Sequence, residues 1–262
     1  MADRDLQARI DDIRWYHEFD FGAGLTARSR EPDVELHRRL WRFTETQLAA
    51  IDFRDKSVLD IGAWDGYWSF FAERRGAGSV LATDDLSQNW SDGRGLRLAK
   101  ELLRSNVEIR QDISVYDLSS LQRRFDVVMC FGVYYHLLDP FLAFARIRHC
   151  CHRDSLVLVE GDVGLTLEAE AVLYQFRDPT RQAFLPSAPA LQELLAAAYL
   201  QVRSQAWLHG LSGLAGRAKR RLLGARANDR VFWVCAPFEG RNDRHHYEPP
   251  FGLKVYDERF RT

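Results

Sequence analysis

The sequence has few cysteines, and none is spaced as a metal or redox motif requires. The 262 residues contain four, at Cys130, Cys150, Cys151 and Cys235, without a CxxC pair. Two adjacent cysteines rarely bridge each other, so the pattern supports neither a disulfide framework nor a zinc site. We therefore expect reduced thiols in a cytoplasmic protein that has no bound metal.

Long apolar runs and an excess of one charge are also missing. No run approaches the roughly 20 apolar residues of a membrane-spanning helix, and the first residues, MADRDLQARIDDIRW, are too charged for a signal peptide. Thirty-six basic and thirty-seven acidic side chains give a net charge of -1. No overall field attracts a polyanion, so we expect a soluble protein for which nucleic acid is an unfavoured partner.

The sequence does contain a strand–turn–helix signature in KSVLDIGAWDGYWSFF, residues Lys56–Phe71. An apolar run ends at Gly62, and an aromatic-rich run predicts a buried helix after Gly66. Such a turn presents free backbone N–H groups to a ligand, and glycines let that ligand come close. The GxGxxG pattern of dinucleotide-binding loops is absent, because Trp64 stands where a glycine is expected.

Strands and helices alternate after this turn, which predicts an α/β fold with a mostly parallel, seven-stranded sheet. A helical cap over 1–52 precedes the main domain, 53–240, which contains a substrate-covering loop or helix at about 161–187, and a tail follows at 241–262. We expect strands at 57–61, 79–83, 107–111, 125–131, 155–160, 201–207 and 230–236, and helices at 67–75, 96–105, 140–151 and 189–199.

Candidate ligand-binding residues follow the first three strands, where parallel sheets bind their ligands. Asp84 lies roughly 20 residues after the glycine turn, as expected of a carboxylate that accepts hydrogen bonds from ribose hydroxyls. Asp112 could accept from an adenine amino group while Ile113 packs on the ring. In the alternative interpretation, Ile113 is ordinary core and Asp85 caps a helix or turn.

Several motifs resemble those of the class I S-adenosylmethionine-dependent methyltransferases. VLDIGAWDG resembles their glycine loop, ATDD their acidic second-strand motif, and FDVVMCFGVYYHLLDP (Phe125–Pro140) their fourth-strand motif. The last stretch and WYHEFDFG (Trp15–Gly22) are similar to one branch, the tRNA uridine carboxymethyltransferases and their small-molecule relatives. The likeness covers roughly residues 10–205 and implies a Rossmann-like fold with S-adenosyl-L-methionine as cofactor.

The resemblance also implies roles for particular residues. The methionine part, the ribose and the adenine of the cofactor would meet residues after the first three strands, Trp64 would flank the cofactor, and two residues after the fourth strand would line the sulfonium region. The cofactor-binding set is Asp60, Gly62, Ala63, Trp64, Gly66, Asp84, Asp85, Asp112, Ile113, Phe131 and Gly132.

Two histidines are candidates for the catalytic base. His136 follows the fourth strand, and a neutral imidazole suits proton abstraction from a hydroxyl, although it could instead hydrogen-bond a neighbouring loop. His17 lies in the aromatic stretch, where the alternative is packing with its imidazole hydrogen-bonded to the backbone. The candidate substrate residues are Tyr16, Tyr135, Glu160 and Asp162; Tyr135 could also be an aromatic wall, and one of the two acids could cap a turn.

Two further features have a plain structural interpretation. His149 and His152, in HCCHR, look like a helix end, where histidine and arginine are electrostatically favoured, rather than metal ligands. A basic amphipathic segment is read as a solvated helix, with contact to RNA or an anionic membrane as the alternative. Its cations are Arg217, Lys219, Arg220, Arg221 and Arg226.

The combined pattern predicts a methyltransferase that acts on a small-molecule acceptor, with O-methylation in specialised metabolism as the first hypothesis. Positioning and desolvation supply most of the rate in such a reaction, because the sulfonium already activates the methyl group. The alternative in the same branch is carboxymethyl or methyl transfer to a tRNA uridine. A nicotinamide-dependent dehydrogenase would need the missing GxGxxG, and a non-catalytic module would not need the intact acids.

Overall fold

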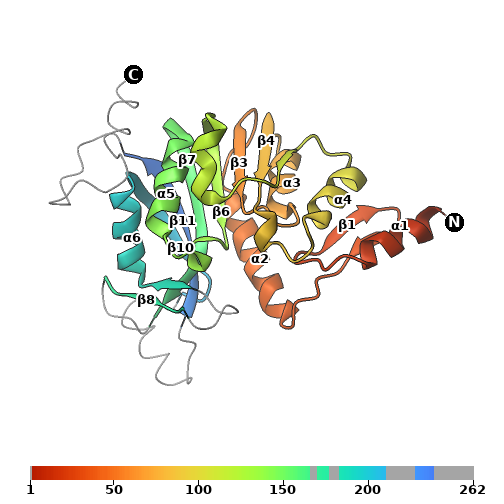
Figure 1. Ribbon diagram of the computed structural model, residues 1–262, viewed down its shortest axis with the longest axis horizontal. Coiled ribbons are helices and arrows are strands. Elements are labelled where there is room, and N and C mark those ends of the chain that lie inside the picture. Colours follow the sequence, from red (N-terminus) through yellow and green to blue (C-terminus); the bar gives the residue numbers. More distant parts are fainter. Residues whose placement is uncertain (1, 166–169, 177–182, 211–227, 239–262) are drawn as a thin grey trace. The chain divides into compact units, whose positions relative to one another are not determined.

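The structure is a computed structural model that describes residues 2–165, 170–176, 183–210 and 228–238. The chain divides into two compact units, residues 1–115 and residues 116–262. Figure 1 shows the elements coloured along the chain, with the first unit in red to yellow. Each unit is described by itself below.

The first unit begins with α1 (Ala2–Asp11), a hairpin of β1 (Phe19–Gly22) and β2 (Leu25–Ala27), and α2 (Val34–Leu48). The expected helical cap contains no strands, so the hairpin is a correction. Gly22 and Gly24 have positive φ angles of 82° and 81°, which lets the chain reverse between two short strands. Asp33 starts α2 by accepting a hydrogen bond from the backbone N–H of Leu36.

The rest of the first unit is the expected alternation: β3 (Ser57–Ile61), α3 (Tyr67–Arg74), β4 (Ser79–Thr83), the short η1 (Leu86–Gln88), α4 (Arg94–Leu103) and β5 (Glu108–Arg110). The predicted bounds of β3 and β4 are confirmed. Both strands pair in parallel with Ile61 opposite Thr83, and β4 pairs in parallel with β5. Their carboxyl ends, and the residues that follow them, therefore share one edge.

The second unit carries the remaining elements: η2 (Val115–Leu121), β6 (Phe125–Phe131), η3 (Tyr134–His136), α5 (Pro140–His149), β7 (Cys151–Gly164), β8 (Val172–Tyr174), β9 (Phe184–Pro186), α6 (Ala188–Ala197), β10 (Leu200–Trp207) and β11 (Asn228–Pro237). β6 and β7 are parallel, whereas β11 is antiparallel to both β7 and β10. The seven long-sheet strands have the order β10-β11-β7-β6-β3-β4-β5, which confirms the mostly parallel, Rossmann-like fold.

Three expectations in the second unit need correction. β7 begins at Cys151 and continues to Gly164, so Glu160 and Asp162 lie inside the strand and His152 is not at a helix end. The strand is longer than predicted because β11 pairs with it as far as Gly164. The described part of the covering segment contains the two-stranded β8–β9 sheet instead of a loop or helix.

Other expectations lie outside the described residues. These are the basic segment, with Arg217, Lys219, Arg220, Arg221 and Arg226, and the tail 241–262. The domain boundaries at residues 52 and 240 stay predictions.

Candidate functional site

The glycine turn of the first unit joins β3 to α3 through three residues with positive φ angles. Gly62, Trp64 and Gly66 have φ values of 66°, 58° and 83°. The backbone N–H of Ala63 donates to the carbonyl of Thr83 at 3.0 Å, and that of Gly66 donates to the carbonyl of Ala63 at 2.7 Å. Trp64 therefore occupies a left-handed conformation that is strained for a bulky residue, as expected where a glycine would be usual.

Gly66 also has a packing role that the motif alone does not reveal. A Cβ atom there would lie 2.3 Å from Cδ1 of Leu96 and 2.7 Å from Cε2 of Phe70. Gly66 precedes the first residue of α3, so a side chain would push this helix away from the core. The glycine is thus required by the fold as well as by any ligand that approaches the turn.

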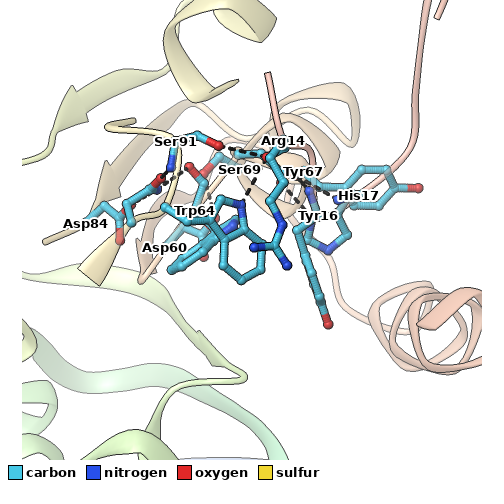
Figure 2. Close-up of polar contacts among 12 residues, drawn as sticks. Arg14, Tyr16, His17, Asp60, Trp64, Tyr67, Ser69, Asp84 and Ser91 are labelled. Atoms are coloured by element: carbon cyan, nitrogen blue, oxygen red, sulfur yellow. Dashed lines mark hydrogen bonds and ion pairs between the residues drawn. The ribbon is translucent and has the colours of Figure 1, made fainter. Parts of the chain in front are cut away.

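Two carboxylates at the ends of β3 and β4 are buried, Asp60 and Asp84 (Figure 2). The Ser69 hydroxyl donates to Asp60 Oδ2 at 2.6 Å, and the Asn89 amide donates to Asp84 Oδ2 at 2.7 Å. Burial raises the pKa of Asp60 to about 7 and that of Asp84 to about 6, and the charge of Asp84 adds to the effect on Asp60. Because the side-chain donors to both acids are neutral within the described residues, a polar or cationic ligand would stabilise the charged carboxylates.

The other predicted cofactor residues of this unit differ in their surroundings. Asp85 accepts from the backbone N–H of Ser87 at 3.0 Å and caps η1, in agreement with the alternative interpretation. Asp112 is exposed and paired with Arg110 at 2.9 and 3.0 Å, and Ile113 is buried. To contact a ligand, the Asp112 carboxylate would have to leave its ion pair with Arg110. An exposed ion pair of this kind stabilises a protein by only about 0–1 kcal/mol.

His17, labelled in Figure 2, forms a buried pair with Asp65 of the glycine turn. Nδ1 of His17 lies 2.6 Å from Oδ1 of Asp65, while Oδ2 accepts from the backbone N–H groups of Tyr16 at 3.1 Å and His17 at 2.7 Å. The expected backbone partner for the imidazole is thus replaced by a carboxylate. His17 Nε2 is buried without a hydrogen-bond partner in the described part of the chain.

Aromatic rings enclose the His17 imidazole. It stacks on Tyr67 at 4.7 Å and 13°, and the rings of Tyr16, Trp41 and Trp68 lie at 4.7, 5.1 and 5.5 Å. This agrees with the packing interpretation of the aromatic stretch. In this arrangement the imidazole joins the N-terminal segment to the glycine turn, which favours a positioning role over that of a base.

Sequence reasoning missed three partners around these acids. Asp65 and Ser69 lie within the glycine turn and helix, but the motif gives them no role. Asn89 bridges Asp84 to the turn, since its amide also approaches the Trp64 carbonyl at 3.3 Å. Trp90 packs edge-on to Trp64 at 4.5 Å, and the Arg14 guanidinium lies 4.0 Å from the Trp90 ring. No motif indicates the Ser69 and Asn89 contacts, and those of Trp90 with Trp64 and Arg14 join segments far apart in sequence.

The polar group of the second unit is built on β7 and β11. Arg230 lies opposite Asp162 in the antiparallel register. Its Nε and Nη2 donate to the two oxygens of Glu160 at 2.7 and 2.6 Å, and Nη1 donates to the Tyr135 hydroxyl at 2.9 Å and to Asp162 at 3.4 Å. Burial raises the pKa of Glu160, and the Arg230 charge opposes that rise. Arg230 is the organising residue of this group and was not predicted.

Two sequence-predicted residues lie on η3. Tyr135 is buried, and burial raises its pKa to about 12, so its hydroxyl keeps its proton. His136 is an exposed residue. Partial desolvation of its imidazole and, to a smaller extent, the positive charge of Arg230 lower its pKa below the usual 6.5. Its imidazole is therefore neutral near pH 7, as a base requires.

The strand end that precedes η3 also has a defined geometry. Phe131 packs against Phe232 at 5.5 Å between ring centroids. Gly132 has a φ of 72°, and a Cβ atom there would lie 3.3 Å from the Tyr135 hydroxyl. The glycine thus leaves room for Tyr135 to lie over the strand end.

The described residues offer no group of three side chains that could hold a metal. His152 instead contacts Asp126 at 3.1 Å, and all four cysteines are buried and form no disulfide. Within the same residues, no helix has both the length and the apolar character to span a membrane.

Buried acids at the carboxyl ends of β3 and β4, a glycine turn and a mostly parallel sheet are the features expected of a class I S-adenosylmethionine-dependent methyltransferase of Rossmann-like fold. Residues 34–205 match the family model described as a methyltransferase domain, and the chain belongs to this family. The enzyme class and the adenosyl cofactor implied by the sequence motifs are thereby confirmed.

Comparisons with individual proteins fit this family. A tRNA U34 carboxymethyltransferase of Pseudomonas paraeruginosa is 31% identical over 147 residues, which are 54% of this chain and 44% of the relative. The match therefore spans less than half of the curated relative.

Two solved structures share the fold. The N-terminal domain of EvdMO1 with SAH bound has a TM-score of 0.61 and 18% identity, over 91% of this chain and 98% of that one. The 1,6-didemethyltoxoflavin-N1-methyltransferase of Burkholderia thailandensis, with 1,6-didemethyltoxoflavin and S-adenosylhomocysteine bound, has a TM-score of 0.52 and 16% identity, over 85% and 99%.

Proposed function

We propose that this methyltransferase acts on a small-molecule acceptor and methylates it at oxygen, in specialised metabolism. The observation that carries the proposal is the neutral, exposed imidazole of His136 beside the Tyr135–Arg230 pair. A hydroxyl must lose its proton as it attacks, whereas many nitrogen nucleophiles have a free lone pair. A base held neutral near pH 7 is therefore most useful for a hydroxyl acceptor.

The residues of the first unit fit the cofactor. Asp60 and Asp84 are buried carboxylates with neutral side-chain donors, and a ligand with an ammonium group and ribose hydroxyls would complement them. We assign Asp60 and the backbone of the glycine turn to the methionine part, and Asp84 to the ribose. S-adenosylmethionine, when bound, supplies a methyl group already activated by the sulfonium.

The remaining cofactor assignments rest on position along the chain. Asp112 and Ile113 follow β5, as an adenine contact would require, and Trp64 belongs to the turn itself. Phe131 and Gly132 stay predictions for the sulfonium region. Asp85 is already used as a cap, so we give it no direct contact.

The second unit supplies the groups that would act on the acceptor. The His136 imidazole accepts the hydroxyl proton on a ring nitrogen, and Tyr135, held by Arg230, orients the acceptor. Glu160 and Asp162 fix Arg230 in place. Two carboxylates and one guanidinium leave this group with an excess of negative charge, which favours a neutral or cationic acceptor over an anionic one. Tyr16 and His17 keep a positioning role on the N-terminal segment.

Carboxymethyl transfer to a tRNA uridine is the second candidate, because the curated relatives are tRNA U34 carboxymethyltransferases. A carboxylated cofactor needs a cation for its extra carboxylate, and RNA needs a basic surface. Arg230 is bound by two hydrogen bonds to Glu160, and the chain has a net charge of -1. Both facts place this candidate second. We also infer a cytoplasmic location, to which four cysteines outside disulfides are suited.

Mass spectrometry of small molecules extracted from the purified protein separates the two candidates. S-adenosylmethionine or S-adenosylhomocysteine in the extract supports methyl transfer, whereas a carboxylated cofactor supports the rival. A radiolabelled methyl-transfer assay with alcohols and phenols, compared with matched amines, then tests the acceptor atom. Transfer to amines alone would contradict the O-methylation proposal.

A further inference from the structure

Strand β8 of the second unit exposes an unusual run of apolar side chains. Val172, Leu173 and Tyr174 are 47%, 42% and 38% exposed, and Phe176 just beyond the strand is 77% exposed. Isolated exposed apolar residues are normal in proteins, but a contiguous group marks a binding surface. The proposed acceptor groups of Tyr135 and His136 do not account for this surface.

Two of these side chains form a flat aromatic surface. The rings of Tyr174 and Phe176 stack at 5.7 Å with an interplanar angle of 3°, and we call this pair the aromatic platform. The β8–β9 pairing places Tyr174 opposite Phe184, whose ring lies 5.3 Å from that of Tyr174. The backbone N–H of Gln175 donates to the Ala183 carbonyl at 2.9 Å. The hairpin therefore holds the platform while leaving Phe176 open to solvent.

Ring contacts connect the platform to η3 within the same unit. Phe184 lies 6.5 Å from Tyr134, Tyr134 lies 5.6 Å from Tyr135, and Tyr135 lies 4.4 Å from His136, measured between ring centroids. Phe184 and Tyr134 are buried, so these contacts pack the β8–β9 hairpin against η3, which carries the two proposed acceptor residues. A ligand bound at the platform would therefore lie on the hairpin that packs against this acceptor region.

The charges around the platform select among aromatic ligands. The pKa of Tyr174 is raised by partial burial and then by the negative charge of Asp139, which places this carboxylate near the platform. Asp139 already serves as the N-cap of α5. The Asp139 carboxylate opposes an anionic ligand at the platform, including the phosphates of RNA.

We propose that the aromatic platform binds the ring of a neutral or cationic, small aromatic acceptor. Stacking on the platform determines which class of acceptor is bound. This inference rests on the proposed function, because the acceptor that it describes is the substrate of that same reaction. Stacking of a nucleobase on an aromatic side chain raises affinity about tenfold or more, and we expect a similar contribution from the platform.

The binding test uses N-phenyl-1-naphthylamine, a neutral aromatic probe whose fluorescence rises on binding, with the full chain and saturating S-adenosylmethionine. We expect Phe176→Ser to weaken probe binding at least tenfold. Leu173→Ser is the matched control, because residue 173 is also exposed on β8 but projects from the other face of the strand. Equal affinity of wild type and Phe176→Ser, or an equal loss in Leu173→Ser, would overturn the proposal.

Competition by defined compounds tests the charge and class of the ligand. We expect tyramine to displace the probe at a concentration at least tenfold lower than 4-hydroxybenzoate or cyclohexanol. Equal displacement by the anion or by the non-aromatic alcohol would refute the proposed acceptor class. If light scattering shows a dimer that Phe176→Ser dissociates, the platform is an interface between copies of the chain and the proposal is wrong.

Calorimetry with S-adenosylmethionine separates this inference from the proposed function. Normal cofactor binding with unchanged probe affinity in Phe176→Ser would reject the platform alone. Absence of cofactor binding by a well-folded wild type would reject the proposed function, whatever the probe result.

Discussion

Asp60 and Asp84 are held in a site that opposes their charge when no ligand is bound. Burial raises the pKa of Asp60 to about 7, above its ordinary value of 3.8. Between these two values the folded protein binds more protons than the unfolded chain, so stability falls as pH rises through this window. The ionised Asp60 carboxylate therefore lowers the free energy of unfolding, and a ligand that stabilises its charge can offset this loss.

Asp60→Asn should remove this destabilisation because the amide has nearly the same shape and carries no charge. We expect the free energy of unfolding at pH 8 to increase by roughly 1–3 kcal/mol, with the gain shrinking toward pH 4. Urea unfolding of the cofactor-free protein at both pH values measures the change. A gain that does not depend on pH would show that the Asp60 charge is not its source.

His136 is the proposed base, and its replacement should affect chemistry and not cofactor binding. We expect His136→Gln to lower kcat by roughly 10²–10³-fold while leaving the affinity for S-adenosylmethionine unchanged. Since the base must be neutral and its pKa is lowered, the wild-type kcat at saturating S-adenosylmethionine should fall only below about pH 6.5. His152→Gln, at a histidine paired with Asp126, is the control. A wild-type rate in His136→Gln would remove this residue from the mechanism.

At the scale of elements, Asp65 attaches the N-terminal segment to the glycine turn. Its carboxylate is hydrogen-bonded by two backbone N–H groups and the His17 imidazole, all in a buried position. Asp65→Ala leaves these groups without a partner, so we expect a loss of about 2–4 kcal/mol in unfolding free energy. Hydrogen exchange should become faster at residues 15–20.

Asp20→Ala is the control for this experiment, because exposed Asp20 accepts only a local bond from the Gly22 N–H within the described contacts. It should leave exchange at residues 15–18 as in wild type. Unchanged exchange in Asp65→Ala, measured by mass spectrometry, would contradict the attachment through this carboxylate.

The elements that could be predicted are those with local signals. The sequence predicts β3, β4 and β6 with the observed bounds, because each is a largely apolar run with a glycine or a polar residue on either side. The β1–β2 hairpin was missed because its strands are very short, and the extension of β7 was missed because it depends on pairing with β11. Such pairing joins segments far apart in sequence and leaves no periodic signal.

The same distinction applies to the candidate site. Asp60 and Asp84 could be found because each lies at the carboxyl end of a strand that the sequence indicates. Arg230 could not, since its partners Glu160 and Tyr135 lie 70 and 95 residues away along the chain. Asp65 was visible in the glycine turn, but only the fold shows that His17 is its partner.

At the scale of the whole molecule, charge distribution argues for the acceptor class more than the fold does. The same α/β fold supports several functions, so function must come from the site. The net charge of -1 offers no general attraction to a polyanion, while buried acids lie at both candidate groups, with Asp60 and Asp84 in the first unit and Glu160 in the second. A cationic cofactor and a neutral or cationic acceptor are consistent with this distribution.

Cofactor binding should also depend on pH. A bound cation favours the ionised forms of Asp60 and Asp84, whose pKa values are about 7 and about 6, so binding should release protons near neutral pH. We expect the affinity for S-adenosylmethionine to fall as the pH is lowered from 8 to 5. Calorimetry in buffers with different ionisation enthalpies measures the released protons, and proton uptake on binding would contradict the assignment of these acids.

The central claim is that the buried acid after β4 binds the adenosyl cofactor. Isothermal titration of S-adenosylmethionine into the wild type and Asp84→Ala at pH 8 tests it most directly, with circular dichroism to verify that the variant is folded. We predict saturable binding to the wild type and a loss of roughly 100-fold or more in the variant, since two hydrogen bonds to a buried carboxylate are removed. No binding to the folded wild type, or equal affinity of the two proteins, would contradict the account.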